Sequence, residues 1–430
     1  MRLYNLKDSH EEVSFSKAVQ LGLGKKQGLF FPLELPKLNT QTLTDLMNLN
    51  FIDRSTKILS YFLHDEISSK DLKNIVKKSF SFQKPILKSI SKNIACLELF
   101  HGPTLAFKDF GARFMANILQ FLNVKNTPMT ILTATSGDTG AAVAHAFYKM
   151  KNIRVIILYP NKKISTLQEK LFCTLGNNIY TIAINGSFDD CQNLVKKAFN
   201  DQDLKKKIIL TSANSINISR LLAQICYYFE AFSKTPFEYH KKLIISVPCG
   251  NFGNLTAGLL AKSLGLPIKN FIAATNSNNT VPNFLKTGIW NPKKTISTIS
   301  NAMDISRPNN WPRVKELFLK KKWSLKSLKY GSVSERNTKN TLKKLYNLGY
   351  ISEPHAAIAY YLLKKKIKKT DYGLFFGTAH PTKFKNIVEN ILKINLKLPE
   401  ILKKYNKKKM LSHFMKPNFE KLKKILLEKF

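Results

Sequence analysis

Residues 100–111 read FHGPTLAFKDFG and set one lysine, Lys108, between Phe107 and Phe110, after a His-Gly-Pro turn. An ammonium group held near aromatic rings is partly desolvated. Desolvation disfavours the charged form and makes the amine nucleophilic near neutral pH. Such a lysine can form an imine with an aldehyde. The alternative is a surface lysine whose carbon stem packs on the rings.

Strands and helices alternate on both sides of this stretch. The short apolar strand IACLEL leads into it, and Phe110, Phe114 and Ile118 then form a helical stripe typical of core packing. Further on, MTILTA predicts a strand, TSGDTG a turn, AAVAHAFYKM a helix and IRVIILYP a second strand. This βαβ unit recurs at LIISVP and at YGLFFG, so the sequence predicts an α/β fold with parallel sheets covered by helices on both faces.

The chain of 430 residues is too long for one ordinary domain. Residues 1–93 contain amphipathic segments with polar breaks and predict a helical and extended N-terminal domain without identifiable chemistry. The α/β part that follows is divided at a polar segment near 235–241. We therefore expect a first α/β domain at 94–238 and a second at 239–430 with C-terminal helices, and these two can interleave.

The formal net charge of +41 suggests a polyanion-binding protein as one hypothesis. The lysines, however, are spread over the whole chain and accompany many Asn, Ile and Phe residues, as a biased nucleotide composition would produce. The strongest runs, at 363–369, 403–410 and 421–430, are typical of solvated helix faces. We expect no specific nucleic-acid binding, and only non-specific adhesion at low salt.

Five scattered cysteines without a CxxC motif predict neither a disulfide framework nor a zinc site, and favour a reducing cytoplasm. The N-terminus has no apolar signal-peptide core, and no apolar run approaches the roughly 20 residues of a membrane helix. The eight histidines show no metal-ligand spacing, so we expect no metal site.

Two strand-to-helix turns are candidate anion sites, because ligands bind where the strands of an open α/β sheet end. In CGNFGN (249–254), Gly250 and Gly253 let backbone N–H groups point into one concavity at a helix start, which favours phosphate. In TSGDTG (135–140), Ser136, Asp138 and Thr139 crowd another helix start, and this turn could hold a carboxylate. The alternatives are a tight turn that needs glycine and a well-capped helix.

Three further segments carry polar side chains near predicted helix starts. GTAHP (377–381) offers the hydroxyl of Thr378 at a strand end, and SANSINISR (212–220) sets Asn217 and Arg220 ahead of an apolar helix. Arg220 could clamp a phosphate or form an ordinary ion pair, and Asn217 could be a helix cap. In ISEPHAAIAYYLL (351–363), Ser352 is expected to cap the helix, with Glu353 at its positive end.

A poised lysine and two anion cradles at sheet ends together suggest an anionic aldehyde cofactor. Pyridoxal phosphate fits: the lysine makes the imine, one cradle takes the cofactor phosphate and the other takes a substrate carboxylate.

These motifs resemble those of the threonine synthases, pyridoxal-phosphate enzymes of fold type II related to the tryptophan synthase β chain. The likeness covers nearly the whole chain, from LYNLKD and GLGKKQGLFFP near the N-terminus to LSHF at 411–414. It is carried by HGPTLAFKDFG, TATSGDTGAAVAHAFY, SANSINISR, VPCGNFGN and FGTAHP, which together are highly specific. The resemblance implies two open, twisted, mostly parallel sheets covered by helices. It also implies conversion of O-phospho-L-homoserine and water to L-threonine and phosphate, and a monomer.

The resemblance also implies roles for individual residues. Lys108 matches the Schiff-base lysine, Thr378 the hydroxyl residue at the pyridine nitrogen, and Asp138 a position near the 3′-oxygen where many fold-type relatives carry asparagine. The loop that holds the cofactor phosphate matches Gly250, Asn251, Phe252, Gly253 and Asn254. The candidates for substrate contacts are Ser136 and Thr139 for the carboxylate, and Arg220 and Asn217 for the phosphate.

Under this interpretation the freed Lys108 amine moves protons at the substrate Cα and Cβ while phosphate leaves Cγ, and water then adds at Cβ. A second hypothesis keeps the cofactor but makes the chain a lyase like the serine and threonine dehydratases, which release ammonia and a keto acid. The polyanion-binding protein is the third.

Overall fold

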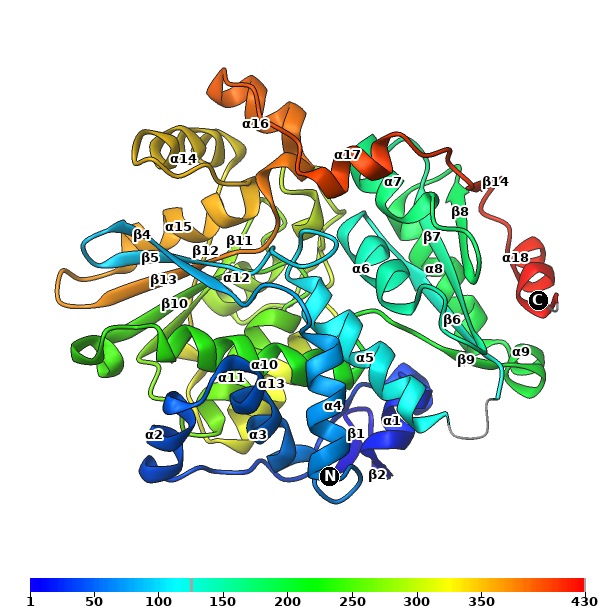
Figure 1. The fold of residues 1–430 in the computed structure, drawn as a ribbon, viewed down its shortest axis with the longest axis horizontal. Coiled ribbons are helices and arrows are strands. Elements are labelled where there is room, and N and C mark those ends of the chain that lie inside the picture. The colour runs from blue at the N-terminus through cyan, green and yellow to red at the C-terminus, as the bar shows by residue number, and fades with distance from the viewer. Residues whose placement is uncertain (124–126, 429–430) are drawn as a thin grey trace.

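The computed structural model describes residues 1–123 and 127–428, and the strands among them form three sheets (Figure 1). The smallest sheet is antiparallel, in the order β2-β1-β3, and consists of β1 (Arg2–Asn5), β2 (Asp8–Ser14) and β3 (Phe30–Pro32). The helices near it in sequence are α1 (Phe15–Leu21), α2 (Thr40–Asn48), α3 (Phe51–Leu63) and α4 (Ser69–Ser79). Residues 1–80 thus contain the helical and extended segments that the sequence predicts.

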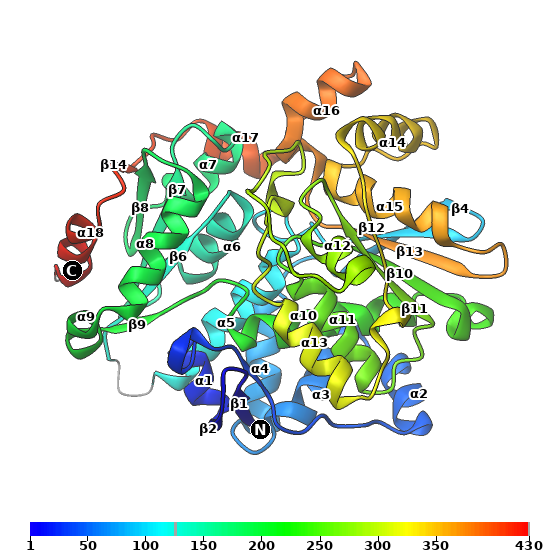
Figure 2. The ribbon, with the colours of Figure 1, turned by 180° about the vertical axis from the view of Figure 1, so that it is seen from behind.

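A six-stranded sheet occupies the left of Figure 1, in the order β12-β11-β10-β13-β5-β4. Its strands are β4 (Ile86–Ser91), β5 (Ile94–Glu98), β10 (Leu243–Pro248), β11 (Asn270–Thr275), β12 (Lys329–Ser332) and β13 (Tyr372–Gly377). All neighbouring pairs are parallel except β4 with β5. The view from behind shows α14 (Glu335–Asn347) and α15 (Pro354–Lys366) on one side of this sheet, with α10 (Ile218–Ser233), α11 (Gly253–Ser263) and α13 (Trp311–Lys320) on the other (Figure 2).

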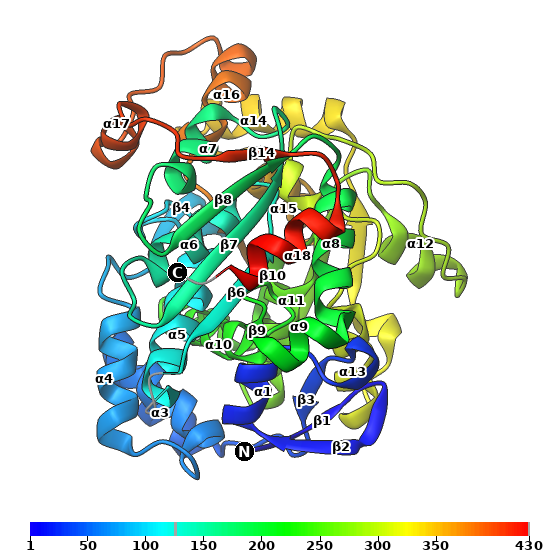
Figure 3. The same ribbon diagram turned by 90° about the vertical axis from the view of Figure 1, so that its right-hand side faces the viewer.

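A five-stranded parallel sheet lies beside it, in the order β14-β8-β7-β6-β9 (Figure 3). Its strands are β6 (Met129–Ala134), β7 (Ile153–Pro160), β8 (Ile179–Ile184), β9 (Ile209–Thr211) and β14 (His413–Met415). The helices that accompany it are α5 (Lys108–Leu122), α6 (Asp138–Phe147), α7 (Thr166–Cys173), α8 (Phe188–Asn200), α9 (Gln202–Lys207) and α18 (Phe419–Leu427). The prediction of two mostly parallel, helix-covered sheets is confirmed.

The central strands are apolar on both faces because helices cover both. Every residue of β7 and of β10 is buried. Successive side chains point to opposite faces, so Val155 joins the core shared with α5 and α10, while its neighbour Ile156 joins a separate core with α8 and α18.

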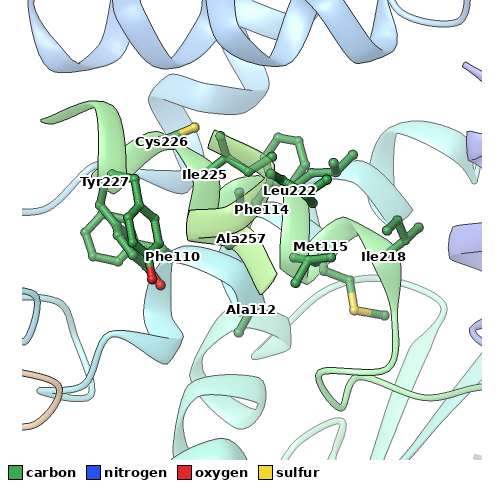
Figure 4. Packing of buried hydrophobic residues seen from close by; sticks show 14 of the residues in the cluster. Phe110, Ala112, Phe114, Met115, Ile218, Leu222, Ile225, Cys226, Tyr227 and Ala257 are labelled. Atoms are coloured by element: carbon green, nitrogen blue, oxygen red, sulfur yellow. The ribbon is translucent and has the colours of Figure 1, made fainter. Parts of the chain in front are cut away.

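The long helix α10 links the two sheets through the largest core cluster. It is buried from Ile218 to Phe232, so it lies inside the core on all sides, and the polar side chains that it carries, such as Arg220 and Glu230, are buried with it. Figure 4 shows Phe110, Phe114 and Met115 of α5 among Leu222 and Ile225 of α10. The packing of α5 on α10 fixes where α5 begins, and α5 begins at Lys108.

The two large sheets exchange segments. β4 and β5 join the sheet of β10 and β13, while β14, which is near the C-terminus, joins the sheet of β6 to β9. The α/β domains proposed at 94–238 and 239–430 therefore interleave, and their boundaries stay a prediction. The remaining helices are α12 (Thr280–Thr287), α16 (Lys385–Leu392) and α17 (Glu400–Asn406). None of the helices among the described residues combines the length and the apolar character required to cross a bilayer.

Candidate active site

Lys108 is the first residue of α5, and the turn before it is fixed by hydrogen bonds to the next residue, Asp109. Asp109 accepts hydrogen bonds from the Thr104 backbone N–H (2.9 Å) and from the Thr104 hydroxyl (2.6 Å). A Cβ at Gly102 would lie 2.4 Å from an Asp109 carboxylate oxygen, so the Gly-Pro turn closes only with glycine there. Leu105 then takes a left-handed conformation (φ 56°) that directs the chain into the helix.

This turn is paired by its backbone with the GTAHP segment. The Phe107 N–H donates to the Thr378 carbonyl (2.9 Å), and the His380 N–H donates to the Leu105 carbonyl (3.0 Å). Since β5 and β13 are neighbours in the six-stranded sheet, the segments after them leave the same sheet edge together. This pairing brings Lys108 and Thr378, which are far apart in sequence, to one site.

The Lys108 side chain is 16 % exposed, and its Nζ lies 5.4 Å from the centre of the Phe107 ring. Phe110, the other expected neighbour, instead packs against Phe82 and Tyr227 in the core, because it lies on the buried face of α5. Burial lowers the pKa of the Lys108 ammonium, and this effect outweighs that of the Asp138 carboxylate, which raises it. Burial thus shifts Lys108 towards its free-amine form.

Asp138 begins α6 and lies between two lysines. Its Oδ2 is 3.7 Å from Lys108 Nζ, its Oδ1 is 2.5 Å from Lys383 Nζ, and Gln168 Nε2 donates to Oδ1 at 3.2 Å. Burial alone would raise the pKa of Asp138, but the ammonium groups of Lys383 and Lys108 hold it well below its usual value. Asp138 is therefore a carboxylate.

The TSGDTG turn is held by the Thr135 hydroxyl, which accepts from the N–H groups of Gly137 (3.0 Å) and Gly140 (2.8 Å). Gly137 has φ 132°, a conformation open to glycine. The candidate substrate residues Ser136 and Thr139 both line the cavity that contains Lys108.

The loop from Cys249 to Asn254 connects β10 to α11 and turns sharply at Phe252, which is left-handed (φ 61°). A Cβ at Gly250 would lie 2.8 Å from Met303 Cα and 2.9 Å from the Ala302 carbonyl, so the loop needs glycine there. Asn251 donates to the Ser215 hydroxyl (2.7 Å). Gly253 starts α11, and its backbone N–H belongs to the first turn of that helix, whose positive end suits an anion.

Of the two residues expected to contact the substrate phosphate, Arg220 lies in the wall of the cavity and Asn217 does not. Arg220 is buried and lines the cavity; its Nη1 donates to the Ala213 carbonyl (2.6 Å), and burial lowers its pKa to about 10. Asn217 caps α10, with its amide donating to the Val19 carbonyl (2.9 Å) and its oxygen accepting from Ser219. The structure places Asn217 in this cap, which was the alternative interpretation, and not in the wall of the cavity.

The Thr378 hydroxyl donates to Glu353 Oε1 (3.2 Å), which leaves its oxygen lone pairs for a further partner. Glu353 also accepts from the Ala356 N–H and from the backbone and ring of His355. Glu353, and not Ser352, is therefore the N-cap of α15, so that expectation was wrong. A buried carboxylate matches several donors here, whereas the Ser352 hydroxyl donates to the carbonyl of Glu353.

Nearly all of the predicted site residues line one cavity. It is lined, among others, by Lys108, Ser136, Asp138, Thr139, Arg220, Gly250, Asn251, Phe252, Gly253, Asn254 and Thr378. Of the predicted site residues, Asn217 alone is not among the lining residues in the described chain.

Unsatisfied polar atoms around the cavity indicate that it binds a polar group. Within the described residues, Arg220 Nε, Asn254 Nδ2 and His355 Nε2 are buried without a hydrogen-bond partner, and all three residues line the cavity. Buried polar groups are normally paired, so these three atoms leave hydrogen-bonding capacity beside the cavity. Together with the glycine loop and the amine of Lys108, they fit an anionic aldehyde such as pyridoxal phosphate.

Sequence reasoning missed Lys383, Glu353 and His355 as site residues. Lys383 is one lysine among very many, and nothing in its neighbours distinguishes it. Glu353 was expected only to favour a helix end, and His355 was given no role. No local pattern in the sequence marks either residue as part of the site.

The family model described as "Pyridoxal-phosphate dependent enzyme" matches residues 85–373, and the one described as "Threonine synthase N terminus" matches residues 4–80. Among curated proteins, the threonine synthase of Buchnera aphidicola subsp. Baizongia pistaciae is 69 % identical, with 100 % of each chain covered. That of Escherichia coli (strain K12) is 58 % identical, with 99 % of each chain covered.

Solved structures of threonine synthases have the same fold as this chain. The chain matches the crystal structure of threonine synthase from Escherichia coli with a TM-score of 0.96 at 58 % identity, covering 99 % of both chains. It matches the pyridoxal-phosphate-bound threonine synthase from Brucella melitensis with a TM-score of 0.91 at 29 % identity, also covering 99 % of both. A threonine deaminase from Solanum lycopersicum, at 15 % identity and a TM-score of 0.57, shares the fold alone.

Proposed function

The chain belongs to the threonine synthase family of pyridoxal-phosphate-dependent lyases, and we propose that it converts O-phospho-L-homoserine and water to L-threonine and phosphate. The observation that carries the proposal is the single cavity in which a partly buried lysine, a glycine loop at a helix start and a strand-end threonine meet.

Each group has a role in holding the cofactor. Lys108 would hold it covalently, the backbone N–H groups of the loop from Gly250 to Asn254 would bind its phosphate, and Thr378 would face its ring nitrogen. Pyridoxal phosphate, when bound, supplies a conjugated ring that takes up the negative charge developing on the substrate carbons.

The residues that line the cavity explain how protons move. Lys108 in its free-amine form accepts a proton from the substrate Cα, and the same group reaches the adjacent carbons because it lies at the end of a flexible stem. The nearby Asp138 carboxylate stabilises the ammonium form while Lys108 carries that proton. A lysine whose two forms are balanced in this way can both take and return protons.

The charged and hydroxyl groups of the wall suit an amino-acid phosphate. Arg220 is buried with an unpaired Nε, and a guanidinium binds phosphate or carboxylate oxygens at two points. Ser136 and Thr139 lie at the start of α6, where hydroxyls and the helix dipole favour the substrate carboxylate.

A product assay tests the function. Purified protein loaded with pyridoxal phosphate should release phosphate and L-threonine from O-phospho-L-homoserine in equal amounts. Ammonia and a keto acid would instead support the dehydratase hypothesis. Lys108→Ala should lose turnover, and borohydride reduction followed by peptide mapping should mark Lys108 in the unmodified chain.

We further propose that the chain acts as a monomer in a reducing cytoplasm. The five cysteines are buried free thiols, which supports such a compartment. Light scattering of the loaded enzyme during turnover would test the monomer, because an active dimer would contradict it.

A further inference from the structure

Lys383 is a lysine with none of its side chain exposed, and it contacts two parts of the site. Its Nζ lies 2.5 Å from Asp138 Oδ1 and donates to the Thr104 carbonyl at 2.8 Å. Lysine is almost never fully buried unless it is paired. Thr104 belongs to the turn before Lys108, so Lys383 links that turn to the start of α6.

Asp138 is closer to Lys383 than to Lys108. The distances from its carboxylate oxygens are 2.5 Å to Lys383 Nζ and 3.7 Å to Lys108 Nζ. One negative charge cannot fully compensate two ammonium groups, and the stronger contact belongs to Lys383. Lys108 is therefore the lysine that can give up its proton at the smaller cost.

The other charged groups around Lys108, Asp138 and Lys383 either also favour the free amine of Lys108 or are hydrogen-bonded to other partners. Arg220 of α10 adds positive charge near Lys108, and His355 of α15 faces Asp138 while its ring is bound to Glu353. Asp109 of α5 accepts from Thr104 and faces Lys383. Thus the carboxylate nearest to Lys108 is Asp138, and Lys383 shares it.

We propose that Lys383 is a positioning residue for the reaction: it neutralises Asp138 and fixes it in place, so that Lys108 is left as the free amine that the chemistry requires. This inference rests on the proposed function of Lys108. It does not make Lys383 a group that touches the substrate, since its contacts are with Asp138 and Thr104.

The test compares variants of the full-length chain. Lys383→Met removes the charge and keeps the length of the side chain. In that variant Lys108 becomes the main cation for Asp138, which favours its ammonium form. An opposite charge at this distance shifts a lysine by about one to two pH units, so the free amine at neutral pH should fall about 10- to 100-fold.

Two readouts measure this shift. The acid limb of the kcat profile of the loaded enzyme, which reports the complex in which Lys108 has been freed, should move up by about one to two pH units. In the full-length chain stripped of cofactor, trace labelling with acetic anhydride across pH, with mass spectrometry of the Lys108 peptide, should show the same displacement. Lys383→Arg, which keeps the charge, should retain the profile of the unmodified chain.

A second variant keeps the test decisive if the first is unstable. The double substitution Asp138→Asn with Lys383→Met removes both charges and should return the labelling profile towards that of the unmodified chain. Lys269→Met is the matched control, because Lys269 also pairs with a buried aspartate, Asp371 (2.6 Å), away from the residues that line the cavity. It should leave both profiles unchanged.

Three outcomes would overturn the proposal: a displacement for Lys383→Met no larger than for Lys269→Met, a double variant still displaced like the single one, or Lys383→Arg displaced as far as Lys383→Met. The labelling readout needs no substrate, so it separates this proposal from the proposed function. If the unmodified chain makes no L-threonine while Lys383→Met still shows the displacement in the labelling profile, only the proposed function is contradicted.

Discussion

At the scale of single residues, the site depends on close approach as much as on charge. Asp138 is ionised in a buried place because two lysines and an amide surround it, and the glycines of the 249–254 loop let other backbone come near. A differently charged side chain beside Asp138 would remove the first set of contacts, and a larger side chain at a loop glycine would remove the second.

Gly250→Ala should weaken cofactor binding. The added Cβ would meet Met303 Cα at 2.8 Å and the Ala302 carbonyl at 2.9 Å, and these backbone atoms cannot yield as a flexible side chain would. Moving the loop by even a fraction of an ångström misaligns the N–H groups that would hold the phosphate. We expect the Kd for pyridoxal phosphate to rise about 10- to 100-fold, since two or more hydrogen bonds to a charged group are affected.

Fluorescence titration of the stripped chain with the cofactor measures this Kd. The matched variant is Gly253→Ala in the same loop, where the nearest atoms are side-chain atoms of Asn310 (3.3 Å) and Ser215 (3.4 Å). It should have the smaller effect, and equal losses in the two variants would contradict the steric explanation.

At the scale of elements, two partly buried histidines hold local structure through hydrogen bonds to the backbone. His145 of α6 bonds the Leu171 carbonyl of α7 (2.8 Å), and His380, after β13, accepts from the Thr382 N–H in the turn that follows. Burial lowers the pKa of each of these histidines to about 4.

The free energy of unfolding should therefore fall in mild acid. The unfolded chain binds protons at these histidines below about pH 6.5, whereas the folded chain resists protonation down to about pH 4, so stability is lost as the pH falls through this window. The loss is at most about 3 kcal/mol for each histidine. Urea unfolding at several pH values between 7.5 and 4.5 measures it.

His145→Gln should flatten that pH dependence by removing one of the two groups. A slope that is unchanged in the His145 variant would show that the acid loss arises elsewhere.

The C-terminal helix α18 is a second element whose contribution can be measured separately. Figure 3 shows α18 beside α8 and the five-stranded sheet. Leu422 and Leu426 are fully buried in the core that α18 shares with α8 and this sheet. Leu422→Ala should destabilise the fold by about 2–5 kcal/mol through the cavity that it leaves. Thermal unfolding would show the loss, while Lys424→Ala on the exposed face of the same helix should cost little. Equal effects of the two would mean that α18 does not contribute to the core.

At the scale of the whole molecule, pattern and topology were predictable to different degrees. Continuous apolar runs such as β7 and β10 predict buried parallel strands, and the motifs around Lys108 predict most of the cavity wall. The pairing of β5 with β13, which joins Lys108 to Thr378, depends on contacts far apart in sequence. A local pattern cannot show such contacts.

The same limit explains the residues that were missed or placed elsewhere. Lys383 is set apart from the other lysines only by its burial against Asp138, a property of the folded chain. Asn217 and Arg220 are three residues apart at the start of α10, yet one caps the helix and the other faces the cavity. Their different roles follow from the direction in which α10 packs.

The net charge of +41 is the remaining whole-molecule property, and it leads to a prediction about polyanions. Lysines at 364–369 and at 403–409 lie mostly on the surface, in two runs that are separate in sequence, at the end of α15 and around α17. Binding to a duplex DNA should therefore be visible at about 20 mM salt and vanish by about 150 mM, because it comes from counterion release alone. Replacing the lysines of either run by glutamine should weaken the low-salt binding to a similar, modest extent, as measured by fluorescence anisotropy. Tight binding that persists at about 150 mM salt, or that is abolished by changing one run only, would identify a dedicated nucleic-acid surface and revive the polyanion hypothesis.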